Sequence, residues 1–293
     1  MARIAIVGVG AIGGALAALL DVAGHHEITL CTRRPLERLL VKTPEGDVNV
    51  RAVNVTDPTH AQPADWVLVA TKTYDAHSAA TWFPSLCRED TPVAVIQNGV
   101  EHRERFAPYM KPELMLPVII DCPVERQEDG SVHRRGLAQM KVETGVLGGE
   151  FAHLFAGSGA QIELTGDFLT AAWRKLCINS VGVLNALTMK PAGVLRDQAM
   201  GNLALELAAE CVAVGRAEGA QLQDAICQQV LDGYRAQPPD SINSILADRL
   251  AGRRTEIDAR NGIIVRKGKM HGIPTPLNRM AVALIESLGS TSI

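Results

Sequence analysis

Three glycines near the N-terminus, Gly8, Gly10 and Gly13, have the spacing of a phosphate-binding turn. They follow a short apolar run and precede an alanine- and leucine-rich run, an order that predicts strand, turn and helix. In such a unit the first glycine permits the sharp turn, the second lets backbone approach a pyrophosphate, and the third lets helix pack on strand. The N–H groups at the helix start, which include Ala11 and Ile12, would bind the pyrophosphate. The pattern predicts a dinucleotide site, and a purely structural glycine turn is the alternative.

The end of the second predicted strand carries basic residues. This strand, residues 27–31, lies where a βαβ unit requires it, and Thr32-Arg33-Arg34-Pro35 follows it. NAD-binding folds usually place an acidic residue there, for the ribose 2′-hydroxyl. Guanidinium groups match the geometry of a 2′-phosphate, so Arg33 and Arg34 favour NADP(H) over NAD(H). The alternative is that two surface arginines close the strand.

Polar side chains also follow two further predicted strands. Lys72 ends the apolar run 65–72, and Asn98-Gly99 follows the run 93–97. Ligands of open α/β sheets bind just beyond the carboxyl ends of the strands, so Lys72 and Asn98 are candidate site residues. A lone lysine after a strand also occurs for purely structural reasons.

A polar strip interrupts an otherwise apolar helical pattern in the second half of the chain. Lys175 and Asn179 are four residues apart and therefore share one helix face. Such a strip is either solvated surface or the lining of a cleft. Because Cys177, Ile178 and the run 181–184 leave little polar surface, the pattern favours the cleft.

A second polar concentration spans residues 241–258, with Ser244 near its start and Glu256 near its end. Two arginines precede Glu256 and Asp258, which is equally typical of a solvated, salt-bridged helix start. Thr255 followed by Asp258 also fits a capping box. The residue types alone leave both interpretations open.

The composition excludes several classes of function. The 293-residue chain has a formal net charge of −3, 47% hydrophobic residues and only 4% aromatic residues, which disfavours a nucleic-acid partner. No apolar stretch is long enough for a membrane span, and the N-terminus lacks the features of a signal peptide, so we expect a cytoplasmic protein. The six cysteines form no C-x-x-C pair and the histidines no ligand group, so we expect neither disulfides nor a metal.

The overall pattern predicts an α/β fold with an N-terminal Rossmann-type dinucleotide-binding domain followed by an all-helical C-terminal domain. The predicted domains are residues 1–167 and 168–293. Further strands are expected at 48–55, 114–120 and 132–142, with turns at 129–130 and 148–149. Helices are expected at 168–189, 200–219, 222–234, 241–252 and 255–271.

The two halves together resemble the ketopantoate reductase (2-dehydropantoate 2-reductase) family nearly end to end. The residues that carry the resemblance are Gly8, Gly10, Gly13, Arg33, Lys72, Asn98-Gly99, Trp173-x-Lys175 with Asn179, Ser244-x-x-x-Asp248, and the string from Gly252-Arg253-Arg254-Thr255-Glu256-Ile257-Asp258 to Asn261-Gly262. This last string is far more specific than the glycine fingerprint.

The resemblance implies NADPH-dependent reduction of a 2-keto acid to a 2-hydroxy acid, most simply of ketopantoate to pantoate in pantothenate and coenzyme A biosynthesis. It implies that Lys175 is the general acid and Glu256 its partner. It further implies that Ser244, Asn98 and Asn179 bind the substrate. Lys72 and Asn98 would also contact the cofactor, with Lys72 near the nicotinamide ribose.

The chain departs from the family where many members carry a second asparagine one turn after the first. Val183 occupies that position, and the nearest later match, Asn185-Ala-Leu-Thr, is displaced by two residues. Because amide hydrogen bonds in such a pocket discriminate between substrates, this departure concerns the choice of substrate and not the chemistry. Two alternatives stay open, another NADP-dependent hydroxyacid dehydrogenase and a non-catalytic NADP(H)-binding protein. A homodimer is a further hypothesis, because helical second domains often bury an apolar face against a second copy.

Overall fold

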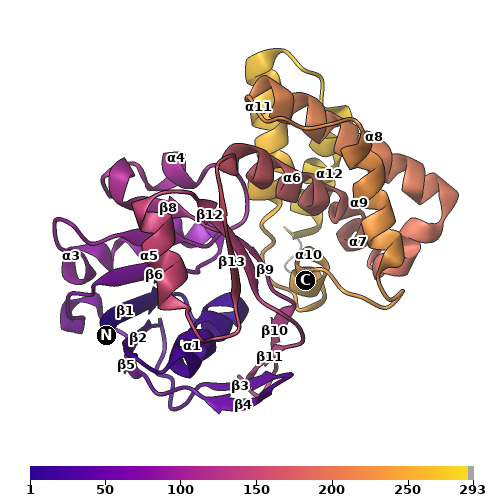
Figure 1. Cartoon of the computed structure of the whole chain (residues 1–293). Helices are drawn as coiled ribbons and strands as arrows, with labels where there is room; N and C mark the ends of the chain where they lie inside the picture. The colour runs from indigo at the N-terminus through magenta and orange to yellow at the C-terminus, as the bar shows by residue number, and fades with distance from the viewer. Residues whose placement is uncertain (290–293) are drawn as a thin grey trace. The chain divides into compact units, whose positions relative to one another are not determined.

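The computed structural model describes residues 1–289, and the chain divides into two compact units (Figure 1). The N-terminal unit contains Met1–Gln97 and Glu101–Phe168. The C-terminal unit contains Leu169 onward together with Asn98–Val100, three residues that follow a strand of the other unit. The sequence did not predict that Asn98–Val100 belong to the C-terminal unit. The predicted domain boundary between residues 167 and 168 stays a proposal.

A six-stranded parallel sheet forms the centre of the N-terminal unit. Its order is β5 (Val53–Val55), β2 (His26–Cys31), β1 (Ala2–Val7), β6 (Trp66–Val69), β7 (Val93–Val95) and β8 (Met115–Pro117). Alternate residues of β1 enter different cores, because successive side chains of a strand point to opposite faces. Ile4 and Ile6 pack with α1 (Ala11–Ala23), and Ala5 and Val7 pack with residues of α2 (Ala76–Ala80), α3 (Phe83–Leu86) and α4 (His102–Phe106).

Helices thus cover both faces of the sheet, as parallel sheets require. The predicted Rossmann-type α/β fold is confirmed. Short 3₁₀ turns connect several elements, namely η1 (Pro58–His60), η2 (Thr73–Asp75) and η3 (Pro112–Leu114).

Two small sheets complete the N-terminal unit. The first has the order β10 (Val124–Arg126), β11 (Val132–Arg134), β3 (Leu40–Thr43) and β4 (Gly46–Asn49), and the second has the order β13 (Gln161–Thr165), β12 (Gln139–Glu143) and β9 (Ile119–Asp121). The prediction of one strand over residues 48–55 was wrong. β4 pairs with β3 in a hairpin, whereas β5 pairs with β2 in the central sheet, so the alternating pattern belongs to two strands in different sheets.

The turn predicted at residues 148–149 was also wrong. Both glycines lie inside the helix α5 (Val146–Leu154), and Gly148 is there because a side chain does not fit. A Cβ at Gly148 would lie 2.0 Å from the carbonyl oxygen of Glu143. The turn predicted at residues 129–130 is present.

The C-terminal unit is helical, with no strand in residues 169–289. Its elements are α6 (Phe168–Val181), α7 (Val183–Thr188), η4 (Ala192–Arg196), α8 (Gln198–Ala217), α9 (Ala225–Ala236), α10 (Ser244–Leu250), a π-helical segment η5 (Asp258–Gly262), α11 (Ile263–His271) and α12 (Pro276–Gly289). The core includes Trp173, Leu176 and Val181 from α6 together with Leu207 and Cys211 from α8. Within residues 1–289, none of the helices has both the length and the apolar character of a membrane span.

The helix predicted over residues 168–189 is divided at Gly182. A Cβ at this position would lie 2.8 Å from the hydroxyl of Tyr234 and 2.9 Å from Nδ2 of Asn243, so close packing requires the glycine. The helix α12 was not predicted at all, although it contributes the buried Ala281 and Ile285 to the core.

Candidate functional site

The glycine turn has the backbone geometry that its sequence requires. Gly8 has φ +94°, and a Cβ there would lie 2.6 Å from Cγ2 of Thr71. A Cβ at Gly13 would lie 2.0 Å from the carbonyl oxygen of Gly8, so α1 packs directly on the turn. At Gly10 a Cβ would meet no atom within 4 Å, and the residue is exposed. The space beside Gly10 is therefore open to a ligand.

The start of α1 suits an anion. The helix has 13 residues, its N-cap is Gly10 without a side-chain hydrogen bond, and its first turn, which contains Ala11 and Ile12, has no acidic residue. Backbone N–H groups in the first turn of a helix have no intrahelical partner and lie at the positive end of the helix dipole. The residues of this turn therefore fit the pyrophosphate of a dinucleotide.

Two more predicted cofactor residues lie in the N-terminal unit. Arg33 follows β2, its side chain is 82% exposed, and its Nη2 lies 4.0 Å from a carboxylate oxygen of Asp75. Lys72 follows β6 by three residues, is half-buried, and its carbonyl oxygen accepts a hydrogen bond from Nε2 of Gln97 at 3.3 Å. An exposed guanidinium with one long ion pair keeps most of its donors for a ligand.

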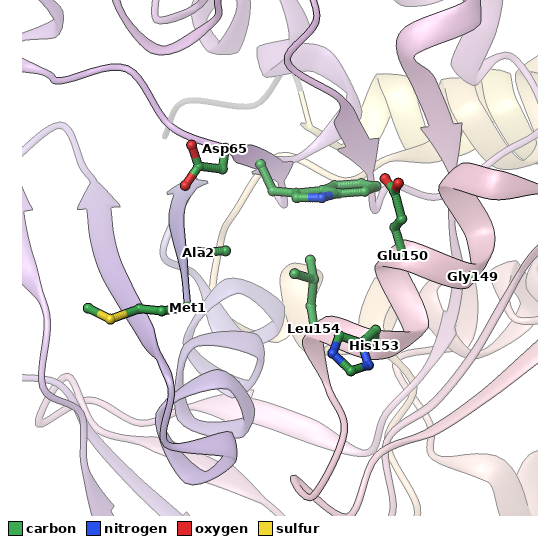
Figure 2. Close-up of a pocket in the computed structure, with 8 residues that line it drawn as sticks. Met1, Ala2, Asp65, Gly149, Glu150, His153 and Leu154 are labelled. Carbon is green, nitrogen blue, oxygen red and sulfur yellow. The ribbon is translucent and has the colours of Figure 1, made fainter.

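An open hollow of the N-terminal unit lies elsewhere (Figure 2). Its lining comprises Met1, Ala2, Asp65, Trp66, Gly149, Glu150, His153 and Leu154. Ala2 begins β1 and Trp66 begins β6, so the hollow lies at the amino ends of the parallel strands. The glycine turn follows the carboxyl end of β1, at the opposite edge of the sheet. We therefore do not assign this hollow to the dinucleotide.

Three of the predicted site residues form one hydrogen-bonded group in the C-terminal unit. Nδ2 of Asn98 donates to Oε2 of Glu256 at 3.0 Å, and Nδ2 of Asn179 donates to Oδ1 of Asn98 at 3.3 Å. Glu256 is only 5% exposed, so its carboxylate has left water and depends on such donors. Residues separated by 158 and 81 positions in sequence are thus brought together.

Lys175 lies on α6 one turn before Asn179, on the same face, and is half-buried. Trp173, on the same helix, is 1% exposed and fixes the position of α6. Trp173 packs so closely on α8 that a Cβ at Gly215 would lie 2.9 Å from its ring. The apolar face of α6 is therefore held rigidly in the core while its polar face carries Lys175 and Asn179.

The sequence analysis missed Arg260, which lies in the π-helical segment η5. Its side chain is 4% exposed, and its Nη2 donates to Oγ of Ser244, the first residue of α10, at 2.7 Å. π-helical segments are rare and occur frequently at functional sites. A signal was present in the sequence, because Arg260 lies four residues after Glu256, the spacing of neighbours on a helical face.

Burial and nearby charges alter the titration of this region. Burial lowers the pKa of Arg260, and the negative charge of Glu256 partly opposes that effect. Burial also raises the pKa of Tyr234, so its phenol is neutral at pH 7. The Tyr234 hydroxyl donates to the carbonyl oxygen of Ile178 on α6 at 3.0 Å.

Asparagine side chains connect the helices around the site. Nδ2 of Asn243 donates to the carbonyl oxygen of Gly182 at 3.1 Å and to Oδ1 of Asn185 at 2.9 Å. Nδ2 of Asn261 donates to the carbonyl oxygen of Ser180 at 3.1 Å and to Oδ1 of Asn278 at 2.9 Å. Asn185 is thus a partner of Asn243 in holding α7 and α10 together.

Two family models cover most of the chain. Residues 4–149 match "Ketopantoate reductase PanE/ApbA", and residues 167–288 match "Ketopantoate reductase PanE/ApbA C terminal". The chain belongs to the ketopantoate reductase family. It is an oxidoreductase that acts on a CH–OH group, and NAD(P) is the cofactor class of the family.

Individual relatives agree with the family assignment. A 2-dehydropantoate 2-reductase of Caulobacter vibrioides is 46% identical over 287 residues, which cover 98% of this chain and 99% of that protein. The crystal structure of a PanE/ApbA family ketopantoate reductase from Ralstonia eutropha is 31% identical with a TM-score of 0.89 and covers 98% of each chain. A D-mandelate dehydrogenase solved with NADH and anilino(oxo)acetate has a TM-score of 0.91 at 20% identity and 98% coverage of each chain, which shows a shared fold.

Proposed function

We propose that this ketopantoate reductase family member uses NADPH to reduce 2-dehydropantoate to pantoate, in pantothenate and coenzyme A biosynthesis. The observation that carries the proposal is the hydrogen-bonded group of Asn179, Asn98 and Glu256, because it unites three residues that the family resemblance assigns to the site. The 46% identity to a relative of that name over nearly the full length supports the choice of substrate.

Lys175 acts as the general acid in this proposal. When bound, NADPH supplies the hydride that reaches the carbonyl carbon of the substrate. The carbonyl oxygen then develops negative charge, which the Lys175 ammonium stabilises and to which it transfers a proton, leaving a 2-hydroxy acid. A solvent proton restores the ammonium after product release.

Glu256 and the asparagines position Lys175 and the substrate. The family resemblance implies that Glu256 holds Lys175 in place or relays a proton to it. Asn98 fixes one oxygen of that carboxylate. Asn98 and Asn179 present amides to polar groups of the substrate, and the hydroxyl of Ser244 binds its carboxylate.

In this proposal the glycine turn, Arg33 and Lys72 of the N-terminal unit bind the cofactor together with Asn98. The N–H groups of Ala11 and Ile12, beside Gly10, would bind the pyrophosphate, and Gly8 and Gly13 shape the turn that presents them. The exposed guanidinium of Arg33 would bind a 2′-phosphate, which favours NADP over NAD. Lys72 and Asn98, each after a strand of the central sheet, would also contact the cofactor, with Lys72 near the nicotinamide ribose.

A turnover assay tests the proposal. The purified protein is mixed with NADPH and ketopantoate, and the absorbance of the reduced nicotinamide is followed. Ketopantoate should be the best substrate in a panel of branched and aromatic 2-keto acids. The absence of turnover with every member of the panel would reject the proposal.

A second candidate is another hydroxyacid dehydrogenase of this fold. The fold similarity to a D-mandelate dehydrogenase and the valine at position 183 favour it. In that case an aromatic 2-keto acid, rather than ketopantoate, should give the highest kcat/KM. A non-catalytic NADP(H)-binding protein would bind NADPH without reducing any keto acid. The proposal also includes a cytoplasmic location. It further includes a homodimer, which light scattering tests through the molar mass in solution.

A further inference from the structure

The Arg260 guanidinium is a buried cation with very few partners. Its side chain is 4% exposed, and the Ser244 hydroxyl is its one hydrogen-bond partner within residues 1–289. A guanidinium has five N–H donors, so most of its capacity is not used by the protein. Burying a charge costs free energy unless an opposite charge or further hydrogen bonds compensate. Arg260 is therefore an exception that requires an explanation.

Neighbouring carboxylates do not neutralise Arg260 directly. Glu256 and Asp248 attract it, but among the described residues no carboxylate oxygen lies within 4.0 Å of its guanidinium nitrogens. Oδ1 of Asp248 instead accepts from Nε of Arg253 at 3.1 Å. An anion of suitable shape would supply both the missing charge and the missing acceptors.

The hydroxyl of Ser244 links Arg260 to the carboxylate of the proposed substrate. Because Ser244 Oγ accepts the hydrogen bond from Arg260, its own O–H proton remains available to donate. One oxygen of a carboxylate can accept a hydrogen bond from this hydroxyl, and the other can accept hydrogen bonds from N–H groups of the guanidinium. Guanidinium and carboxylate groups match in planar geometry and bind through paired hydrogen bonds.

We propose that Arg260 binds the carboxylate of the substrate together with Ser244, and that this contact makes the enzyme specific for 2-keto acids over uncharged ketones. The inference rests on the proposed function, because it names how the substrate of that same site is recognised. It assigns Arg260 a role in binding and none in proton transfer.

The test compares a 2-keto acid with its methyl ester in wild-type enzyme, R260M, R260K and the control R279M. Arg279 is an exposed arginine of α12, so R279M makes the same chemical change away from the site. In R260M the KM for the acid should rise about 10- to 100-fold, the effect of losing a hydrogen bond to a charged group. KM for the ester and the affinity for NADPH should stay within about twofold, because neither involves the carboxylate contact.

R260K retains the charge without the paired geometry, so its KM for the acid should lie between those of wild type and R260M. If R260M does not fold, the comparison of acid and ester in R260K still tests the inference. An equal loss for acid and ester in both variants would overturn the inference, since that result indicates a structural role for Arg260. Unchanged KM values for the acid would overturn it as well.

Calorimetric binding of pantoate in the presence of NADP⁺ separates this inference from the proposed function. Wild type that binds pantoate but reduces no 2-keto acid would reject the function and leave the role of Arg260 to be judged by binding. Loss of that binding in R260M, but not in R279M, would support the carboxylate contact. Equal binding in all forms, or no binding to wild type, would overturn it.

Discussion

The side chain of Glu256 shows how single residues shape this site. A carboxylate that is 5% exposed loses its hydration, and the amide of Asn98 replaces part of it with a 3.0 Å hydrogen bond. By the family resemblance, Glu256 is the partner of Lys175, which lies half-buried on the polar face of α6. Lys175 is therefore the residue whose removal should affect the reaction most.

Replacement of Lys175 tests its role as general acid. We expect K175A to lower kcat by about 10²- to 10⁴-fold, the usual contribution of a positioned acid. The affinity for NADPH, measured by fluorescence titration, should change little. K190A, a change at an exposed lysine of the same unit, should keep its activity. A K175A enzyme with the wild-type rate would remove Lys175 from the mechanism.

Gly13 and Gly10 form a matched pair for testing the glycine turn. G13A places a Cβ 2.0 Å from backbone, and we expect it to destabilise the fold by about 3 kcal/mol or more in urea titrations. G10A meets no atom, so its stability should change by less than about 1 kcal/mol. Its Kd for NADPH should nevertheless rise, because the new methyl group occupies the predicted phosphate position. Equal stability loss in both variants would contradict this assignment.

At the scale of elements, Asn243 fixes the start of α10. Its Oδ1 accepts from the backbone N–H of Leu246 at 3.0 Å as the N-cap, while its Nδ2 bonds Gly182 and Asn185. We expect N243A to cost about 2 to 4 kcal/mol, since it loses a cap and also leaves buried acceptors unpaired. D197A removes an exposed cap of α8 and should cost only about 1 kcal/mol in the same urea titration. Similar losses in both would show that the buried contacts of Asn243 add little.

The buried ring of His102 makes the start of α4 sensitive to acid. Its Nε2 lies 2.8 Å from the carbonyl oxygen of Gln97, the residue before Asn98, so the ring donates there as a neutral imidazole. Burial lowers the pKa of His102 to about 4, with the charges of Arg105 and Arg103 acting in the same direction.

The unfolded chain therefore binds a proton that the folded chain does not, between the ordinary histidine pKa of about 6.5 and about 4. The contribution of His102 to the free energy of unfolding is fully present above pH 6.5. It is lost as the pH falls toward 4, and the total loss is roughly 3 kcal/mol. H102N should flatten the decline of Tm from pH 7 to 5, and H25N, at an exposed histidine, should not. An unchanged slope in H102N would contradict the low pKa.

The sequence predicted the elements whose pattern is local. The spacing of apolar residues and the positions of glycine and proline, read over short stretches of sequence, predict several elements. These elements are the glycine turn, the buried strands β1, β6 and β7, and the helical second half. The pairing of β5 with β2 and of β11 with β3 could not be predicted, because neighbours in a sheet can lie far apart in sequence. The roles of Gly148 and Gly182 could not be predicted for a related reason, since tight packing against another segment requires each of them.

The candidate site was predictable only in part. Asn98, Asn179 and Glu256 were named from sequence, and the structure joins them by hydrogen bonds. The roles of Lys175 and Ser244 stay predictions. Arg260 was missed because an arginine within a charged string usually faces solvent, and only the folded chain shows that it is buried.

At the scale of the whole molecule, cofactor preference should appear as stability. A ligand that binds only the native state raises its free energy of unfolding according to its concentration and Kd. We expect NADPH to raise Tm more than NADH at equal concentration, and R33A to reduce that difference. The control R51A, at an exposed arginine of the same unit, should leave the difference between the two Tm shifts unchanged. A larger shift with NADH would reverse the predicted preference.

The assignment of Asn98–Val100 to the C-terminal unit limits how this protein can be recombined. A chimera joined at residue 168 would receive Glu256 and Asn179 from one parent and Asn98 from the other. Exchange of the C-terminal half between distant homologues therefore requires that both parents share the sequence around Asn98. Gene shuffling should yield active hybrids chiefly when that tripeptide is inherited with the second half.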